Sequence, residues 1–293
     1  MNGLVILNYN SWIATSQLAI KVSSMKIIDK IIIVDNKSSD ESYSRLSLLE
    51  NKKIHVIEAE KNYGYSYGNN IGIKYLVNNY SNLKNIFICN PDVIVDANCF
   101  TEMIFALNNL KEYGMVGAVR TDIEGNYSQR QFWSLPDFKT EIFDCFAIAR
   151  FIRKKRQIYR FDEKLSGVYE VDVLPGSFWG ARVDLLKSID YLDEGTFLYY
   201  EENIISQRIH NAGYKQGIVL SAKYIHNHIN KSPSHFNDIY KPFLNMQKSR
   251  KYYQNKYLDL NHIQRLILSI CMELNNFEMF CICIIKLLCN KIK

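Results

Sequence analysis

Short apolar runs, separated by stretches of helical periodicity, dominate the first 120 residues of the chain. The runs occupy residues 4–10, 30–36, 53–58, 85–95 and 115–119. In Ile86–Cys89 the apolar residues follow one another and leave no polar face for solvent, which predicts a strand buried on both faces. Strands that alternate with helices predict an α/β fold, with a mainly parallel Rossmann-like sheet flanked by helices.

The second half of the chain follows a less regular pattern. Residues 171–183 predict a strand or bend, interrupted by Pro175 and Gly176, and a helix then runs to about residue 189. We expect a helix over 197–211, a strand over 215–222, and only helix from residue 236 onward. The change of pattern predicts a sheet-bearing domain at 1–235 and a C-terminal helical extension at 236–293.

The composition is that of a globular protein, with 47% hydrophobic and 23% charged residues in a chain of 293. The formal net charge of +6 suits an anionic partner, such as nucleotide phosphates, anionic lipid or nucleic acid, and charge alone selects none of them. Seven cysteines without a C-x-x-C pair favour a reduced, cytoplasmic setting.

The C-terminal region raises the question of membrane contact. The late apolar run Met279–Ile285 is far shorter than the roughly 20 residues that a membrane span requires, so we expect a soluble or peripheral protein. The last helices combine an apolar stripe with terminal lysines and would lie on a membrane surface, pack on the sheet-bearing domain or form a dimer. The basic cluster at 150–160 is either a solvated face or a contact for anionic headgroups or a diphosphate.

Polar clusters stand where the predicted strands end or helices begin. They are Asn8–Asn10, Asp35 with Asn36, residues 62–70, Asn90–Asp92, and Glu201 with Glu202. Each cluster alone is compatible with a turn or a helix cap. Ligands of open α/β sheets bind beyond the carboxyl ends of the strands, so the clusters together predict a binding edge.

Five segments carry a resemblance to a known family. They are ILNYN at 6–10, VDNKSSD at 34–40, NYGYS at 62–66, NPDV at 90–93 and FLYYEE at 197–202. In order and spacing this set resembles the family 2 glycosyltransferases, which are non-processive, inverting enzymes of the GT-A fold. It is most similar to the rhamnosyltransferase-like branch of bacterial polysaccharide synthesis, and the resemblance covers about residues 4–230.

The resemblance implies a site for a nucleotide-sugar donor. Asp35 is expected to read the nucleotide base, and Asn62 with Gly64 to pack on the nucleotide, where the missing side chain of Gly64 permits close backbone approach. The other residues expected to line the donor site are Asn8, Asn10, Asn36 and Asn90.

The resemblance also implies a divalent metal ion, Mg²⁺ or Mn²⁺. Asp92 matches the last acidic residue of the DxD-type metal motif of the family, and Asn90 replaces the first. A single carboxylate predicts a weakly bound ion that depends on the donor phosphates. His226 and His228 lie where relatives often carry a histidine near the diphosphate, and either one would complete the coordination sphere.

Glu202 occupies the position of the catalytic base in the family, and Glu201 is its rival. The base takes a proton from an acceptor hydroxyl while that oxygen attacks the anomeric carbon, and a single displacement inverts the configuration. Glu replaces the usual Asp, and Ile204 stands where many relatives carry another acid.

We therefore predict an inverting hexosyltransferase that moves a sugar from a dTDP- or UDP-sugar to a saccharide acceptor, lipid-linked, in bacterial surface polysaccharide synthesis. The alternative is a non-catalytic nucleotide-sugar-binding scaffold protein of the same fold. The chain lacks the Gly-rich phosphate loops of nucleotidyltransferases and dinucleotide-dependent oxidoreductases, and we expect no nucleic-acid partner.

Overall fold

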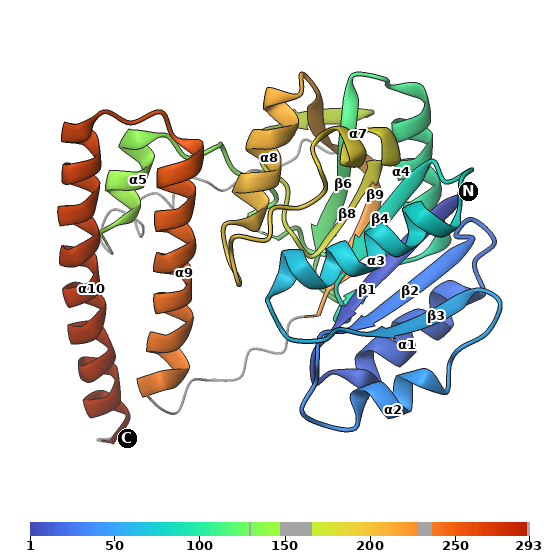
Figure 1. The fold of residues 1–293 in the computed structure, drawn as a ribbon, viewed down its shortest axis with the longest axis horizontal. Helices are drawn as coiled ribbons and strands as arrows, with labels where there is room; N and C mark the ends of the chain where they lie inside the picture. The colour runs from blue at the N-terminus through green and yellow to red at the C-terminus, as the bar shows by residue number, and fades with distance from the viewer. Residues whose placement is uncertain (129, 147–165, 228–235, 292–293) are drawn as a thin grey trace.

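The computed structural model describes residues 1–128, 130–146, 166–227 and 236–291. Two predicted features, the basic cluster at 150–160 and His228, lie outside these residues. A sheet with helices on both sides forms the larger part of the molecule, and a group of long helices stands beside it (Figure 1).

The strands of the sheet agree with the apolar runs in most places. They are β1 (Asn2–Asn8), β2 (Lys30–Asp35), β3 (Ile54–Glu58), β4 (Asn85–Cys89), β5 (Val93–Ile94), β6 (Tyr113–Thr121), β7 (Val168–Val171), β8 (Phe178–Arg182) and β9 (Lys215–His226).

The helices fill most of the intervals between strands and the whole C-terminal region. They are α1 (Trp12–Ser23), α2 (Ser42–Ser47), α3 (Tyr65–Asn79), α4 (Ala97–Asn109), α5 (Phe138–Asp144), α7 (Val183–Ser188), α8 (Glu201–Asn211), α9 (Phe236–Tyr257) and α10 (His262–Lys291).

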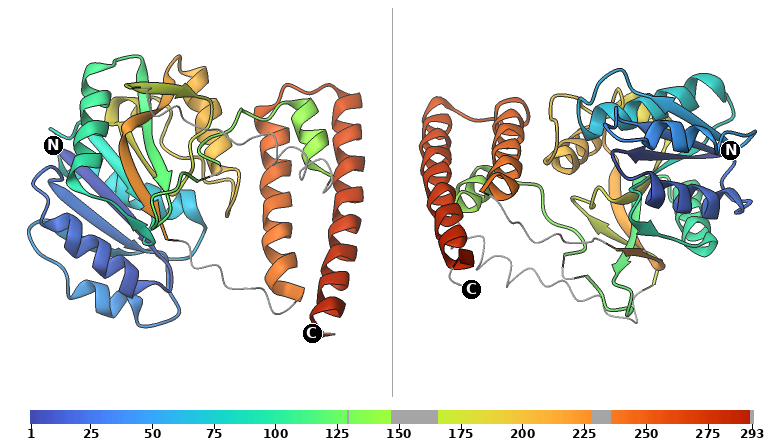
Figure 2. Two further views of the ribbon diagram at one scale, coloured as in Figure 1. Left: turned by 180° about the vertical axis from the view of Figure 1, so that it is seen from behind. Right: turned by 90° about the horizontal axis from the view of Figure 1, so that it is seen from below.

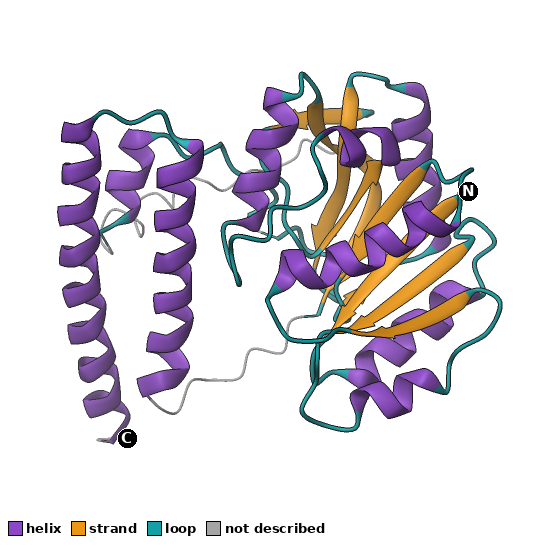
Figure 3. Cartoon of the chain, viewed as in Figure 1, coloured by secondary structure: helices purple, strands orange, loops and turns teal. Residues whose placement is uncertain are grey.

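The described strands form a single sheet in the order β3-β2-β1-β4-β8-β6-β9-β5, and β7 pairs with β9 (Figure 3). β1 is parallel to both β2 and β4, β2 is parallel to β3, and β6 is parallel to β9. β8 runs antiparallel between β4 and β6, and the two short strands β5 and β7 are antiparallel to β9. The predicted α/β fold is confirmed, with antiparallel strands that the sequence pattern did not predict.

The core lies on both faces of the sheet, as the continuous apolar runs require. Along β4, Phe87 and Cys89 pack on one face with residues of α1, α2 and α4, while Ile86 and Ile88 pack on the other with α3, α7 and α8. Because successive side chains of a strand point to opposite faces, each of these residues must be apolar. The carboxyl ends of β1, β2 and β4 therefore meet at one edge of a rigid sheet.

A helical unit, consisting of α5, α9 and α10, stands beside the sheet (Figures 1 and 2). Its small apolar core contains Cys145, Cys271 and Met272, with Ile142 and Phe146 packed against it. Helix α5 comes from the region between β6 and β7, so the unit draws on two separate stretches of the chain. For this unit the sequence pattern predicted only the helices after residue 236, and it missed α5.

Helix α10 leaves an apolar stripe exposed. The large side chains of Ile263, Ile267, Ile270, Leu274 and Phe277 are each between 37% and 71% exposed, at a spacing of three or four residues. Among the described helices, only this one is long and apolar enough to cross a membrane by length and composition, with a mean hydropathy of 1.5. The expectation drawn from the short run at 279–285 therefore underestimated the length of this apolar helix.

Candidate active site

Asn8 and Asp35 end two neighbouring parallel strands and lie directly opposite each other. The Asn8 side-chain amide donates to Asp35 Oδ1 at 2.7 Å, and the Thr15 hydroxyl donates to Asn8 Oδ1 at 2.7 Å. The hydroxyl and backbone N–H of Ser38 donate to the Asp35 carboxylate at 2.6 and 3.0 Å. Both Asn8 and Asp35 are fully buried. The carboxylate expected to read a base therefore orders the loop after β2.

Asn10 faces a cavity of about 720 Å³ beside α1, which we call the β1 cavity. The Asn10 side chain is fixed by Ser39, whose backbone N–H donates to Asn10 Oδ1 at 2.9 Å. Trp12, Asp40 and Asp92 also line this cavity. The sequence analysis assigned neither Trp12 nor Asp40 a role in the site, because nothing in their local pattern marks a cavity wall.

Asn36, Asn62 and Gly64 form a second cluster. The Asn36 amide donates to Asn62 Oδ1 at 3.0 Å and to the Gly64 carbonyl at 3.1 Å. Gly64 has a φ of +103°, and a Cβ atom there would lie 1.9 Å from the carbonyl oxygen of Phe197. The close approach that demands a glycine is therefore to the backbone of the chain itself, whereas the resemblance implied an approach to the nucleotide.

Asp92 and His226 come together because β5 pairs with the end of β9. Val93 lies opposite His226 in the antiparallel register, and the Asn227 N–H donates to the Asp92 carbonyl at 2.9 Å. This pairing places His226 Nε2 at 3.1 Å from Asp92 Oδ2. The predicted strand at 215–222 ended too early, since β9 continues to His226.

The Asp92 and His226 atoms fit adjacent positions around a divalent ion. Ligands at about 2.1 Å from an octahedral ion, at right angles to each other, are about 3 Å apart. Among the described residues, no group of three His, Cys, Asp or Glu side chains gathers in this way. An ion held by Asp92 and His226 would take its other ligands from water and from donor phosphates.

Glu201 and Glu202 begin helix α8 and open onto a cavity of about 310 Å³, which we call the α8 cavity. Asn90 and His226 line the same cavity, so the metal-site and base candidates share one space. The Gly176 N–H donates to Glu202 Oε1 at 3.3 Å, and a Cβ atom at Gly176 would lie 3.0 Å from that same oxygen. Gly176, read from the sequence as an interruption of a strand, therefore holds the carboxylate in place.

The two carboxylates differ in their surroundings. Burial raises the pKa of Glu201 well above its usual value, and the charge of Glu202 raises it further. Burial also raises the pKa of Glu202, but backbone N–H groups and the Arg130 guanidinium oppose that rise. Hydrogen bonds to the charged form and nearby positive charge favour an ionised carboxylate. Glu202 is accordingly the member of the pair that ionises more readily, and so the one available to accept a proton, although burial raises its pKa.

Arg120, Arg130 and Trp133 also line the α8 cavity, and the sequence analysis missed all three as site residues. The Arg130 guanidinium lies over the Trp133 ring at 4.2 Å, and Trp133 Nε1 donates to Asn203 Oδ1 of α8 at 2.7 Å. Their segment lies where the hydrophobic periodicity weakens, so no local pattern placed them. They bring positive charge and an aromatic face to the carboxylates.

Comparisons with known proteins identify the family and the fold of the chain. A sequence profile described as glycosyl transferase family 2 matches residues 4–190, which is more than half of the chain. The chain belongs to glycosyl transferase family 2. The expected class of enzyme, a glycosyltransferase, is thereby confirmed at the level of the family.

One relative in sequence is the low-salt glycan biosynthesis hexosyltransferase Agl10 of Haloferax volcanii. It is 25% identical over 224 residues, which cover 76% of this chain and 66% of the relative. The chain thus spans slightly less than two thirds of the length of that protein.

Two solved structures share the fold. A mannosyltransferase, PcManGT from Pyrobaculum calidifontis, in complex with GDP-Man and Mn²⁺, has a TM-score of 0.58 at 9% identity and covers 96% of this chain and 73% of its own. GalNAc-T7 with UDP, GalNAc and Mn²⁺ has a TM-score of 0.57 at 14% identity, with 94% and 55% covered. At such identities the likeness shows the fold alone, and the predicted GT-A fold is confirmed.

Proposed function

We propose that this member of glycosyl transferase family 2 is an inverting hexosyltransferase that uses a nucleotide-diphosphate sugar. The observation that carries the proposal is the α8 cavity, which brings Glu202 together with Asn90 and His226. A general base must lie within hydrogen-bond reach of the proton it takes, and a cavity wall gives it that access. Both Mn²⁺-bound structural neighbours are named with sugar nucleotides or their parts, which supports the choice of donor class.

In the proposed reaction, Glu202 accepts the proton of an acceptor hydroxyl as that oxygen attacks the anomeric carbon. The Gly176 N–H keeps one carboxylate oxygen in place, so the other is free to face the acceptor. Asp92 and His226 would hold the divalent ion, which would offset the charge of the departing diphosphate. Trp133 and Arg130 form the wall against which an acceptor sugar would pack.

The test is turnover of a panel of nucleotide sugars by the wild-type protein, followed by two isosteric variants. Glu202→Gln should lower kcat by about 10²–10⁴-fold while donor affinity persists, because it removes only the base. Glu201→Gln should lose much less, since an amide resembles the protonated carboxyl favoured at that position. A severe loss of kcat in Glu201→Gln alone would mean that Glu201, rather than Glu202, is the base. Donor binding without any nucleotide release by the wild type would favour the scaffold alternative.

The finer proposal is that the acceptor is a lipid-linked saccharide of bacterial surface polysaccharide synthesis, with dTDP-rhamnose as one candidate donor. Its support is the exposed apolar stripe of α10, which would lie along the inner face of a membrane and bring the site to a lipid carrier. Flotation with vesicles of anionic lipid tests this proposal. Ile267→Asn combined with Leu274→Asn should abolish co-flotation and leave transfer to a soluble acceptor intact.

A further inference from the structure

Two residues with left-handed backbone immediately precede the carboxylates of α8. Tyr199 has a φ of 73° and Tyr200 a φ of 67°. This conformation is uncommon for residues with large side chains and persists where the surrounding structure enforces it. Contacts from outside the loop must therefore hold the stretch that delivers Glu202 to the α8 cavity.

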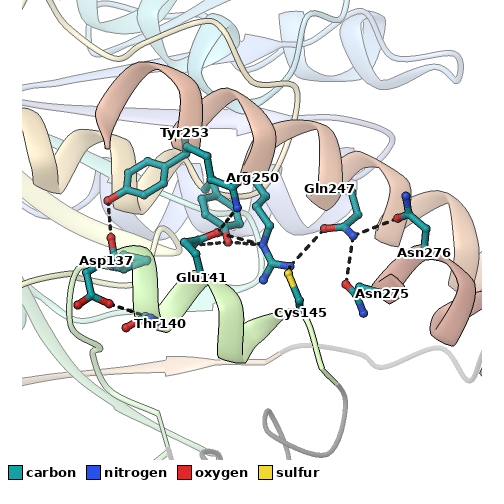
Figure 4. A network of polar contacts seen from close by, with 12 residues as sticks. Asp137, Thr140, Glu141, Cys145, Gln247, Arg250, Tyr253, Asn275 and Asn276 are labelled. Carbon is teal, nitrogen blue, oxygen red and sulfur yellow. Dashed lines mark hydrogen bonds and ion pairs between the residues drawn. The ribbon is translucent and has the colours of Figure 1, made fainter. Parts of the chain in front are cut away.

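The contacts that hold Tyr200 come from the helical unit. Its hydroxyl donates to Glu141 Oε1 of α5 at 2.9 Å and accepts from Arg250 Nε of α9 at 2.8 Å. Arg250 Nε also lies 3.3 Å from Glu141 Oε2. The Glu141 side chain is fully buried and that of Arg250 is 3% exposed, and Figure 4 shows the pair between the two helices.

Further hydrogen bonds fix the direction of both charged groups. Gln254 Nε2 donates to Glu141 Oε2 at 2.7 Å, and Arg250 donates to Gln247 Oε1 at 3.3 Å. Gln247 in turn donates to Asn275 of α10 at 3.1 Å (Figure 4). Apolar side chains of similar volume often stabilise a fold as well as a buried ion pair does. A fully hydrogen-bonded polar network also holds its side chains in one orientation. Here that orientation presents Glu141 and Arg250 to the Tyr200 hydroxyl.

The same helix follows the rest of the loop. The Ser249 hydroxyl donates to the carbonyl of Leu198 at 2.8 Å. A Cβ atom at Gly195 would lie 2.0 Å from the ring of Tyr252, so the loop packs directly on that side chain. Helix α9 thus contacts the loop at several points that precede the carboxylates.

We propose that Glu141 and Arg250 are positioning residues of the active site, which set the entry of α8 into its cavity through the Tyr200 hydroxyl. The inference rests on the proposed function, with Glu202 as the base. Neither residue reaches the reacting atoms. Their effect is geometric, and small displacements of a catalytic group reduce turnover strongly.

The first test compares Tyr200→Phe with Met272→Ala. The first removes only the hydroxyl that joins the loop to the pair, and the second disturbs the core of the helical unit without touching Tyr200. Tyr200→Phe should lower kcat by about 10–100-fold at an unchanged KM for the donor. The acid limb of its kcat profile should move to lower pH, since a displaced Glu202 gains water. Met272→Ala should lower Tm and leave both kcat and its pH profile unchanged.

Hydrogen–deuterium exchange of residues 196–204 supplies a readout that needs no substrate. Exchange there should rise in Tyr200→Phe and stay at the wild-type level in Met272→Ala. If the wild type transfers no sugar, the proposed function fails. The exchange comparison still decides whether the contacts of the Tyr200 hydroxyl with Glu141 and Arg250 hold the loop.

A second variant guards against loss of folding. Glu141→Leu with Arg250→Met keeps apolar volume in the helical unit while removing the polar pair, and should reproduce the effects of Tyr200→Phe. Wild-type exchange in Tyr200→Phe would overturn the inference. An equal fall of kcat in Met272→Ala would also overturn it, because the loss would then follow from lower stability rather than from the missing Tyr200 contacts.

Discussion

Replacement of Gly64 by alanine should force apart two loops that meet at the active site. Gly64 has φ +103° and ψ −169°, a region that is populated almost only by glycine. The new Cβ atom would lie 1.9 Å from the carbonyl oxygen of Phe197 and 2.6 Å from its Cα. Both are backbone atoms, so no side-chain rotation relieves the clash, and the loop before Glu202 must move.

The expected loss of stability follows from these contacts. The backbone conformation alone disfavours alanine by about 1–3 kcal/mol. Separation of the loops also breaks the hydrogen bond from the Tyr65 N–H to Phe197 O, which is 3.0 Å long and contributes about 0.5–1.5 kcal/mol. The free energy of unfolding should fall by about 2–4 kcal/mol in Gly64→Ala, which lowers Tm by roughly 3–7 °C.

Gly125→Ala is the matched control. Gly125 also has a positive φ, +86°, but a Cβ atom there would meet nothing within 4 Å. Left-handed backbone alone costs about 1–2 kcal/mol for an L-residue. Thermal denaturation of both variants, with turnover measured beside it, separates the two effects. The reasoning would be refuted if both variants lost the same amount of Tm and Gly64→Ala kept normal turnover. That result would mean that the backbone at Phe197 moves away from the new Cβ atom at no cost.

Three further changes test the site and its support. Because burial raises the pKa of Glu202, kcat should rise with pH through a limb above the usual glutamate value of about 4.3, and a flat profile from pH 5 to 8 contradicts this. Asp92→Asn should raise the Mn²⁺ concentration for half-maximal turnover at least roughly tenfold, and an unchanged metal response would remove Asp92 from the site. Although burial raises the pKa of Asp193, hydrogen bonds from Lys256 and Tyr257 lower it to about 2. Its contribution of about 2 kcal/mol should be complete above pH 4 and disappear as pH falls through 2; acid denaturation of Asp193→Asn should lack this loss.

The strands that the sequence predicted best are those with a continuous apolar signal. Two such runs, Ile31–Val34 and Ile86–Cys89, are buried on both faces of the sheet. Every residue in them is therefore apolar and indicates a buried strand. The parallel order of β1 and β2 also explains why Asn8 and Asp35 meet, as the polar clusters at strand ends implied. Local pattern and sheet order were sufficient for this edge of the site.

The remaining features depend on contacts between distant segments. The antiparallel β8 is an ordinary strand in its own sequence, and only its pairing with β4 and β6 reveals its direction. Arg130 and Trp133 reach the α8 cavity from a segment without periodicity. The apolar stripe of α10 was predicted as a stripe, but its pattern does not say which face the helical unit covers. The roles of Glu202, Asp92 and the donor-site asparagines stay predictions.

The start of α8 shows why the loop before it needs support from other parts of the chain. The residue before a helix usually accepts a hydrogen bond from the first free N–H groups, and Ser, Thr, Asp or Asn serve best. Tyr200 holds that position and makes no such bond. Its hydroxyl instead bonds outward to Glu141 and Arg250, and the backbone before it accepts a hydrogen bond from Tyr65. An Asp or Ser side chain at position 200 would be too short to make these two contacts, so α8 would lose its link to the helical unit.

The loop that carries the proposed base is thus placed by two stretches far from it in sequence. Gly64 and Tyr65 hold it on the side of the predicted donor loop, and α9 holds it on the side of the helical unit. A rigid helix alone would not achieve this, because its uncapped first turn is free to fray. Since both supports act on residues 197–200, a change on either side reaches Glu202 through the same short segment. The position of the proposed base is therefore a tertiary property of the fold, which depends on contacts from the helical unit as well as on the sheet.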